Sequence, residues 1–149
     1  MRRLVASGLG IGLLLGRIRG SDSGSGTLAA VPALAVGVAL HGAGWHAQLA
    51  AAMLTVSVSV WAAGPFSRDG DDPGWVVVDE IAGALVSVVG LAGWHALVAW
   101  VVFRAADIVK GAFPGVTAAE RLPGGWGVTA DDLVAGVYGL AAGWVVSAL

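Results

Sequence analysis

The segment DDPGWVVVDEIAG, residues 71–83, places four carboxylates within ten positions, directly before a long apolar run. Burying an unpaired carboxylate is costly, so acids at the edge of a membrane-compatible segment require either a cation or a solvated surface. Asp72 with Pro73 is typical of a helix start, in which Asp is the N-cap and Pro the first helical residue. A helix from this point puts Asp72 and Asp79 on one face, with Glu80 beside them. Capping therefore explains Asp72, whereas Asp79 and Glu80 are candidates for a cation site.

A second group of charges lies in FRAADIVKGAF, residues 103–113. Arg104, Asp107 and Lys110 follow one another at intervals of three, which is close enough on a helix for ion pairing. Two interpretations are open. The group is either a self-neutralised helix end whose long side chains reach the membrane surface, or part of a charged site.

Two more acids, Asp131 and Asp132, follow a glycine-rich loop in GGWGVTADDLVAG, residues 124–136. Thr129 is expected to cap a helix there, which puts both acids in a first turn where the helix dipole favours negative charge. Upstream, the TAAE segment that ends at Glu120 is typical of a capping box. Capping and the dipole account for Glu120, Asp131 and Asp132 singly, but not for acids in three separate segments accompanied by bases.

The sum of these charges is typical of phosphate-ester chemistry. Magnesium takes a few carboxylates together with water and substrate oxygens, while Arg and Lys offset phosphoryl charge. The glycine-rich segments 7–12 and 24–30 can bring backbone N–H groups to a phosphate, although glycine, with 24 residues, is too abundant here to be specific. The Asp-Gly-Asp at 69–71 lacks the preceding strand pattern that a haloacid-dehalogenase nucleophile requires.

Composition places the chain among integral membrane proteins. Of its 149 residues 57% are hydrophobic and 12% are charged, and the mean hydropathy is +0.83, so we expect one membrane domain over residues 1–149. A formal charge of −2 with no basic stripe excludes nucleic-acid binding. The absence of cysteine excludes disulfides, a thiolate zinc site and a cysteine-nucleophile phosphatase. The basic, apolar N-terminus runs into arginines instead of a cleavage site, so we interpret it as part of the mature protein.

Three apolar runs organise the chain, at residues 28–64, 81–103 and 133–149. The first is too long for one crossing and is interpreted as a helical hairpin that turns at HGAGWHA. The second contains the same pentapeptide, Ala-Gly-Trp-His-Ala, at 92–96 as the first does at 43–47, so it is expected to turn in the same way. We therefore predict an all-α fold of helical hairpins.

Charge supports the two hairpins. If both runs turn back, all eight Lys and Arg and all ten acids lie on one side, and only neutral His and Trp occupy the far turns. The positive-inside rule then makes the charged side cytoplasmic. We expect a multi-pass or deeply embedded protein of the cytoplasmic membrane with its site on the cytoplasmic face. His41, His46 and His95 are assigned to the far turns.

The order of these segments resembles the phosphatidylglycerophosphatase A family of bacterial membrane enzymes. The matching segments are, in order, Gly8-x-Gly10-x-Gly12, Gly26-Thr27, DPGWVVVDEIAG, FRAADIVK and GGWGVTADDLVAG. The resemblance implies a phospholipid substrate and Mg²⁺-dependent hydrolysis of the phosphomonoester of phosphatidylglycerophosphate, which yields phosphatidylglycerol and inorganic phosphate. It leaves the oligomeric state open.

Carried onto the matching positions, the resemblance implies three groups of site residues. The implied groups are metal ligands at Asp72, Asp79, Glu80, Asp131 and Asp132, catalytic residues at Arg104, Asp107 and Lys110, and substrate-binding residues at Gly26, Thr27, Arg104 and Lys110. Our hypothesis is that Asp107 orients a ligand or the attacking water and that Arg104 with Lys110 clamps the phosphate. Attack by an aspartate, giving an aspartyl-phosphate, is an open alternative.

Four positions depart from the family pattern, in which aromatics usually replace Ala105 and Ala106, proline replaces Gly111 and a basic residue replaces Asp71. These changes bear on lipid packing and substrate preference more than on the acids. An alternative function is a small ion-conducting or transport protein with an acidic vestibule. A conduction path needs polar residues through the membrane, and the apolar runs contain only scattered Ser, Thr and Gln.

Overall fold

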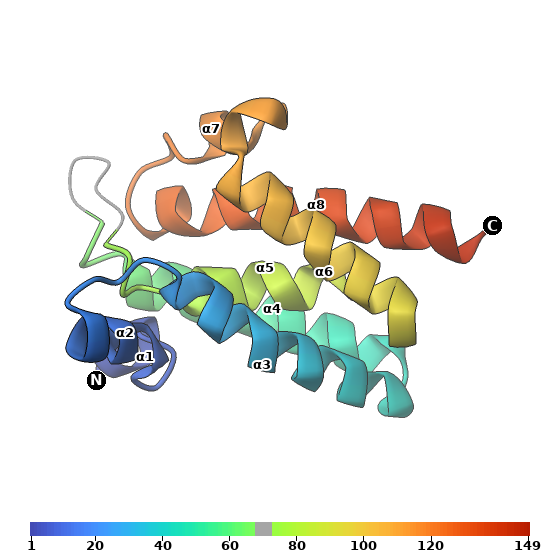
Figure 1. Ribbon diagram of the computed structural model, residues 1–149, viewed down its shortest axis with the longest axis horizontal. Coiled ribbons are helices and arrows are strands. Elements are labelled where there is room, and N and C mark those ends of the chain that lie inside the picture. The colour runs from blue at the N-terminus through green and yellow to red at the C-terminus, as the bar shows by residue number, and fades with distance from the viewer. Residues whose placement is uncertain (68–72) are drawn as a thin grey trace.

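The computed structural model describes residues 1–67 and 73–149. Within these ranges every regular element is helical, so the expected all-α fold is confirmed. In chain order the elements are α1 (Arg2–Ala6), α2 (Ile11–Arg19), α3 (Ser25–Leu40), η1 (His41–Ala43), α4 (Trp45–Ala63), α5 (Val78–Ser87), α6 (Gly93–Ile108), η2 (Lys110–Ala112), α7 (Val116–Ala119) and α8 (Gly125–Ser147) (Figure 1).

Both expected hairpins are present. The 3₁₀ turn η1 joins α3 to α4, and residues 88–92 join α5 to α6. The repeated pentapeptide lies at both turns, where Gly44 and Gly93 adopt φ values of 95° and 55°, a region that glycine enters without strain. Each tryptophan of the repeat packs its ring against that of the following histidine. The two turns lie together at the end of the bundle opposite α1 and α2 (Figure 1).

The short helix α5 occupies the centre of the bundle. It packs against α8, α4, α3 and α6, and seven of its ten residues are buried. Ten residues make a helix about 15 Å long, roughly half of a bilayer's hydrocarbon core. Its neighbours therefore surround α5 and supply the partners that so short an apolar helix needs.

Glycine allows α5 and α8 to approach closely. A Cβ at Gly83 would come within 2.8 Å of the Asp132 carbonyl oxygen and 2.6 Å of the Phe103 ring. A Cβ at Gly136 would come within 2.8 Å of the Gly83 carbonyl oxygen. Small residues at such crossings let helix backbones touch, as they do in membrane helix pairs. This contact brings the first turn of α5 next to the acids of α8.

A buried glutamine joins the far ends of the hairpins. Gln48 is 1% exposed, and its Nε2 donates to the carbonyl oxygens of Gly37, Val88 and Leu91 at 2.9–3.0 Å. Its Oε1 accepts from the Gly90 N–H at 2.8 Å. Through these hydrogen bonds Gln48, a residue of α4, holds the turn between α5 and α6 against α3 and α4.

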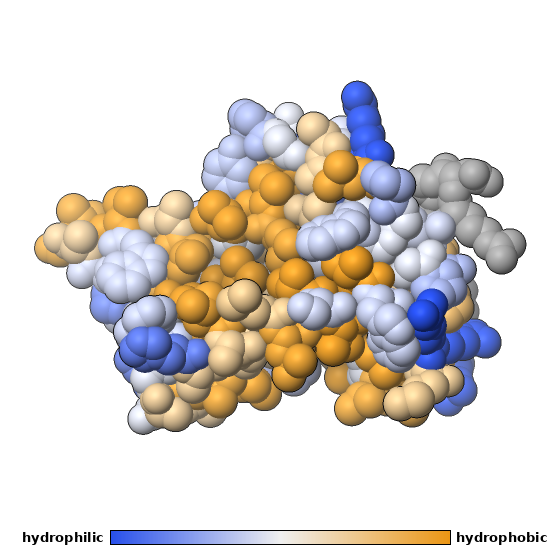
Figure 2. Space-filling model, turned by 180° about the vertical axis from the view of Figure 1, so that it is seen from behind, coloured by the Kyte–Doolittle hydropathy of each residue, from blue (hydrophilic) through white to orange (hydrophobic). Residues whose placement is uncertain are grey.

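The outer surface is strongly apolar. Two helical segments, Ser25–Ala43 and Trp45–Ala63, are long and apolar enough to cross a membrane. Val36 on α3 and Met53 and Leu54 on α4 are exposed, and hydrophobic side chains spread over much of the face in Figure 2. This surface is compatible with membrane association.

Three local expectations are wrong in their boundaries. α5 begins at Val78 instead of Pro73, so Asp79 and Glu80 lie in its first turn. α8 begins at Gly125, and Thr129 is a buried residue inside the helix whose hydroxyl lies 2.7 Å from that of Ser59. The short α7 has Gly115 as its N-cap and makes no side-chain capping hydrogen bond, so the expected capping box does not form. For Thr129 and Glu120, tertiary hydrogen bonds override the local capping signal.

Candidate metal and phosphate site

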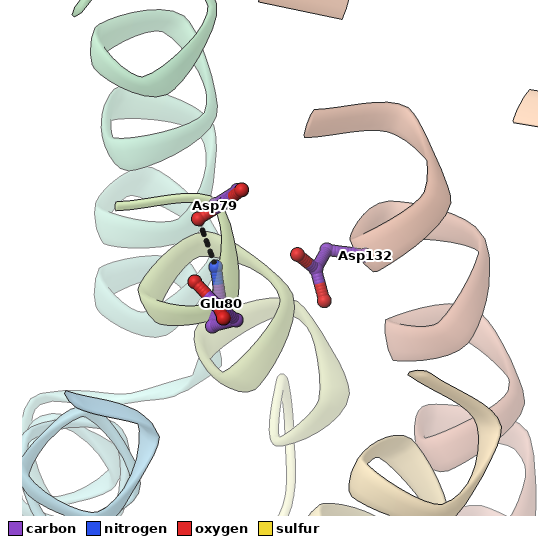
Figure 3. A group of neighbouring side chains, drawn as sticks. All are labelled: Asp79, Glu80 and Asp132. Atoms are coloured by element: carbon purple, nitrogen blue, oxygen red, sulfur yellow. Dashed lines mark hydrogen bonds between the residues drawn. The ribbon is translucent and has the colours of Figure 1, made fainter. Parts of the chain in front are cut away.

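Three carboxylates from two helices converge at one end of the bundle. Asp79 and Glu80 lie in the first turn of α5, and Asp132 faces them from α8 (Figure 3). One carboxylate oxygen from each residue lies within 4.8 Å of the other two. Asp79 and Asp132 are 1% and 3% exposed. Oxygen donors gathered in this way suit a hard divalent cation.

The start of α3 helps to place Glu80. A Cβ at Gly26 would overlap the Glu80 carboxylate, so the absence of a side chain at Gly26 leaves the space that this carboxylate occupies. The Glu80 backbone N–H donates to Asp79 Oδ1 at 3.0 Å, which fixes the Asp79 side chain at the start of α5 (Figure 3). Residues from α3, α5 and α8 thus define the acid cluster.

Burial leaves two oxygens of this cluster without hydrogen-bond donors. Glu80 Oε2 and Asp132 Oδ1 are buried and have no such partner among the described residues. Desolvation raises the pKa of the Glu80 carboxyl. It raises the pKa of the Asp132 carboxyl well above its usual range, and the negative charges of Asp107, Glu80 and Asp131 add to this effect. A cation would satisfy these oxygens and offset the repulsion, so the residues present fit a metal ion.

Arg104 forms a second part of the site on α6. Its Nη1 donates to Asp107 Oδ2 at 2.6 Å, and its Nη2 donates to Thr27 Oγ1 at 3.0 Å. The guanidinium is therefore held in a fixed orientation from two sides. Its Nε is buried and has no hydrogen-bond partner among the described residues. Thr27 follows Gly26, whose Cβ position lies against the Glu80 carboxylate, and this places Arg104 and Asp107 beside the acid cluster.

Lys110 forms the third part, at the end of α6. Its Nζ donates to Asp131 Oδ2 at 2.6 Å and to Glu120 Oε1 at 3.0 Å. Desolvation lowers the pKa of this ammonium, but the hydrogen bonds and charges of Asp131 and Glu120 outweigh it and raise the pKa above the usual value. Lys110 is therefore held in its charged form between two acids.

Acids outnumber bases among the described residues of the acid cluster and its adjoining ion pairs. Six carboxylates surround two cationic side chains; the acids are Asp79, Glu80, Asp107, Glu120, Asp131 and Asp132, and the bases are Arg104 and Lys110. A phosphate dianion would be repelled by this set unless a cation offset the excess.

The structure brings most of the expected site residues together. Gly26 and Thr27 border the acid cluster, and Arg104 and Asp107 adjoin it. Asp131 pairs with Lys110 and stands apart from the group of three acids, although its Oδ1 is buried without a hydrogen-bond partner among the described residues. Asp72 lies outside the described residues.

Sequence reasoning missed the role of Glu120, which it assigned to a capping box. Lys110 and Glu120 are ten residues apart, and the segment from one to the other includes η2 and α7, so the spacing of residues along one helix does not predict their contact. The three histidines lie as expected at the far turns, in η1 and in the first turns of α4 and α6.

The chain is similar in sequence to known proteins. A protein of Bacteroides thetaiotaomicron, provisionally named a phosphatidylinositol-3-phosphatase, is 36% identical over an alignment of 104 positions, and the alignment covers 63% of this chain and 64% of that relative. The chain therefore aligns with somewhat less than two thirds of the relative's length. No solved structure matches it. The family model described as phosphatidylglycerophosphatase A matches residues 4–147, and the chain belongs to that family.

Proposed function

We propose that this protein is a Mg²⁺-dependent lipid phosphatase that hydrolyses the phosphomonoester of phosphatidylglycerophosphate to phosphatidylglycerol and inorganic phosphate. The observation that carries the proposal is the buried group of Asp79, Glu80 and Asp132 beside the fixed guanidinium of Arg104, in a chain of this family. A phosphoryl-transfer site requires buried carboxylates next to an oriented guanidinium, because the carboxylates balance the charge of the metal and the guanidinium balances the charge of the phosphate.

Each residue has a distinct part in this proposal. Asp79, Glu80 and Asp132 hold the cation, which when bound offsets phosphoryl charge and polarises the phosphate oxygens. Arg104 offers its unpaired Nε–H and its remaining N–H bonds to phosphate oxygens, and Asp107 with Thr27 holds it in place. Lys110 keeps Asp131 close to the site and adds positive charge at its edge.

The same arrangement supports a proposal for the position of the protein in the membrane. We infer that α3 and α4 lie in the bilayer and that the end carrying the acid cluster faces the cytoplasm. The chain has no cysteine, so single cysteines at exposed Gly42 and Gly111 give a background-free labelling test. A membrane-impermeant maleimide should reach Gly111→Cys only from the cytoplasmic side. Labelling of Gly111→Cys from outside the cell would reverse the orientation.

An ion-conducting role is the weaker alternative. The charged residues gather at one end of the bundle, and the buried Gln48 near the other end is satisfied by backbone groups. The polar groups thus form a closed site and an internal brace, which suits binding and hydrolysis better than conduction.

Phosphate release by the purified protein tests the proposed substrate. Phosphatidylglycerophosphate, phosphatidylinositol 3-phosphate and phosphatidic acid are compared at one Mg²⁺ concentration, with Asp132→Asn as the control for a contaminating phosphatase. We expect kcat/KM for phosphatidylglycerophosphate to exceed the others by about tenfold or more, roughly 1.4 kcal/mol. A preference for phosphatidylinositol 3-phosphate would favour the activity that the relative's name states over the one proposed here. If no substrate released phosphate, the proposed phosphatase activity would be wrong.

A further inference from the structure

Positive charge is concentrated in the first helices of the chain. Residues 1–21 contain four arginines and no acid, whereas residues 22–149 contain ten acids and four bases. The N-terminal part therefore carries a formal charge of +4 and the remainder −6. The role of these arginines is not accounted for by the acid cluster or by the phosphate clamp.

These arginines, Arg2, Arg3, Arg17 and Arg19, are exposed, and none of them pairs with an acid in the part of the chain that the structure describes. Arg2 and Arg3 instead lie over tryptophan rings, with Cζ at 4.9 Å from the Trp61 centroid and at 5.3 Å from the Trp75 centroid. Strongly hydrophilic side chains in Figure 2 lie at the end of the molecule that carries α1 and α2, among others elsewhere on this face. The positive charge of the arginines is thus available to a negatively charged partner.

Exposed apolar side chains accompany the arginines on the same two helices and on the link between them. Leu4, Leu9, Leu14 and Ile18 are all exposed. Short helices that combine exposed leucines with arginines are typical of segments that lie in the headgroup layer of a membrane. A soluble acidic partner would use the arginines but would leave these leucines in water.

A cavity lies between the two helices and the chain that leads to α5. Its volume is about 660 Å³, and its lining includes Arg3, Arg17, Leu4, Leu13 and Trp75. Arginine on two sides can bind a phosphate through several N–H donors, while the leucines and the tryptophan ring can cover the adjoining glycerol and upper acyl carbons. Asp22 also lines the cavity, and the two arginines outweigh its single charge.

The cavity is coupled to the acid cluster through the backbone. The Val77 N–H donates to the Ala6 carbonyl oxygen at 2.9 Å, and α5 begins at the next residue. Gly12 packs directly on the Trp75 carbonyl, where a Cβ would not fit. An occupant of the cavity would therefore sit on the segment that positions Asp79 and Glu80, without touching either.

We propose that α1, α2 and Trp75 form a binding site for an anionic phospholipid, separate from the acid cluster, with the lipid phosphate held by Arg3 and Arg17. The site anchors the charged end of the protein in the headgroup layer of its own membrane. The occupant is a lipid of the surrounding bilayer, because charge and apolar contact are both offered on one surface. This inference does not depend on hydrolysis, so it can fail or hold independently of the proposed function.

Native mass spectrometry of the full-length protein in a neutral detergent tests the site, with phosphatidylglycerol or phosphatidylcholine added at equal concentration. We expect preferential retention of one phosphatidylglycerol by the unmodified protein. The double variant Arg3→Gln/Arg17→Gln should weaken this binding by about tenfold or more, since it removes both positive charges that attract the lipid phosphate. The matched variant Arg2→Gln/Arg19→Gln removes the same charge outside the cavity and should change it by less than about threefold.

Three results would overturn the proposal. The first is equal retention of the two lipids, which would show that the protein does not distinguish an anionic headgroup from a zwitterionic one. The second is an equal loss in both double variants, which would mean diffuse attraction without a site. The third is competition by phosphatidylglycerophosphate that Asp132→Asn abolishes, which would place the lipid in the acid cluster. Thermal unfolding of each variant in detergent separates lost binding from lost folding.

Discussion

Gly26 and Glu80 are in contact across the start of α3 and the start of α5. A Cβ at Gly26 would overlap Glu80 Oε1 and come within 2.7 Å of its Cδ. The atoms in the way belong to the end of a flexible side chain, so a methyl group at Gly26 would displace the carboxylate instead of the backbone. The glycine is thus a condition for the acid cluster, which explains its place in a site that otherwise consists of charged residues.

Gly26→Ala should therefore weaken metal binding more than folding. We expect the Mg²⁺ concentration for half-maximal activity to rise by about tenfold or more, roughly 1.4 kcal/mol, while the melting temperature in chelator changes by only a few degrees. Gly42→Ala is the matched control, since Gly42 has nothing within 4 Å of its Cβ position and is exposed. An unchanged Mg²⁺ requirement in Gly26→Ala would mean that Glu80 does not hold the metal.

Arg104→Lys tests the phosphate clamp. The guanidinium reaches Asp107 and Thr27 at once and has further donors for a phosphate, whereas an ammonium is one compact charge. We expect kcat/KM to fall at least about tenfold, roughly 1.4 kcal/mol, with little change in the Mg²⁺ requirement. Steady-state kinetics at several Mg²⁺ concentrations separate the two effects. Near-normal turnover would reduce Arg104 to an ion-pair partner of Asp107.

Asp132→Asn should have opposite effects on stability with and without metal. The carboxylate of Asp132 is buried with like charges nearby, so its removal should raise the melting temperature in chelator by a few degrees. Mg²⁺ should stabilise the unmodified protein, by about 2.7 kcal/mol at a concentration 100 times its Kd, and should leave Asp132→Asn nearly unchanged. Equal Mg²⁺ stabilisation of both proteins, measured by thermal unfolding in detergent, would place the cation elsewhere.

Stability should also depend on pH when the metal is removed. Burial raises the pKa of Glu80 from 4.5 and that of Asp132 from 3.8, so the folded protein binds these protons more tightly than the unfolded chain. Their contribution to the free energy of unfolding is then full below about pH 4 and falls as the pH rises through the window up to the folded pKa values. Chemical denaturation in chelator between about pH 5 and 8 should show this decline. A rise over the same interval, unchanged in Asp132→Asn, would contradict the assignment.

The helical hairpins and their shared charged end could be predicted from the sequence because both depend on patterns along the chain. The repeated pentapeptide marks the two turns. The lengths of the apolar runs and the positions of the charged residues between them indicate the hairpins and their shared charged end. The segments that contain Asp79, Glu80, Arg104, Asp107, Lys110, Asp131 and Asp132 were recognisable as motifs. Their residue types also pointed to a cation and a phosphate.

The boundaries and the pairings could not be predicted in the same way. Thr129 is of a residue type that often caps a helix. Instead it lies inside α8, and its hydroxyl hydrogen-bonds with the buried hydroxyl of Ser59, seventy residues away in the sequence. Gln48 read as a stray polar residue in an apolar run, and only the folded chain shows four backbone groups gathered around it. These contacts join residues that are distant in sequence, so the spacing of residues within one segment cannot predict them.

Phosphate release from phosphatidylglycerophosphate as a function of Mg²⁺, by purified protein first stripped with chelator, tests the central claim most directly. The unmodified protein should be inactive in chelator and fully restored by Mg²⁺, because without a cation the acid cluster repels the phosphate. Asp79→Asn and Asp132→Asn should each lower the restored rate about a hundredfold or more, roughly 2.7 kcal/mol. Full activity in excess chelator, or near-normal rates in both variants, would contradict a metal site at Asp79, Glu80 and Asp132.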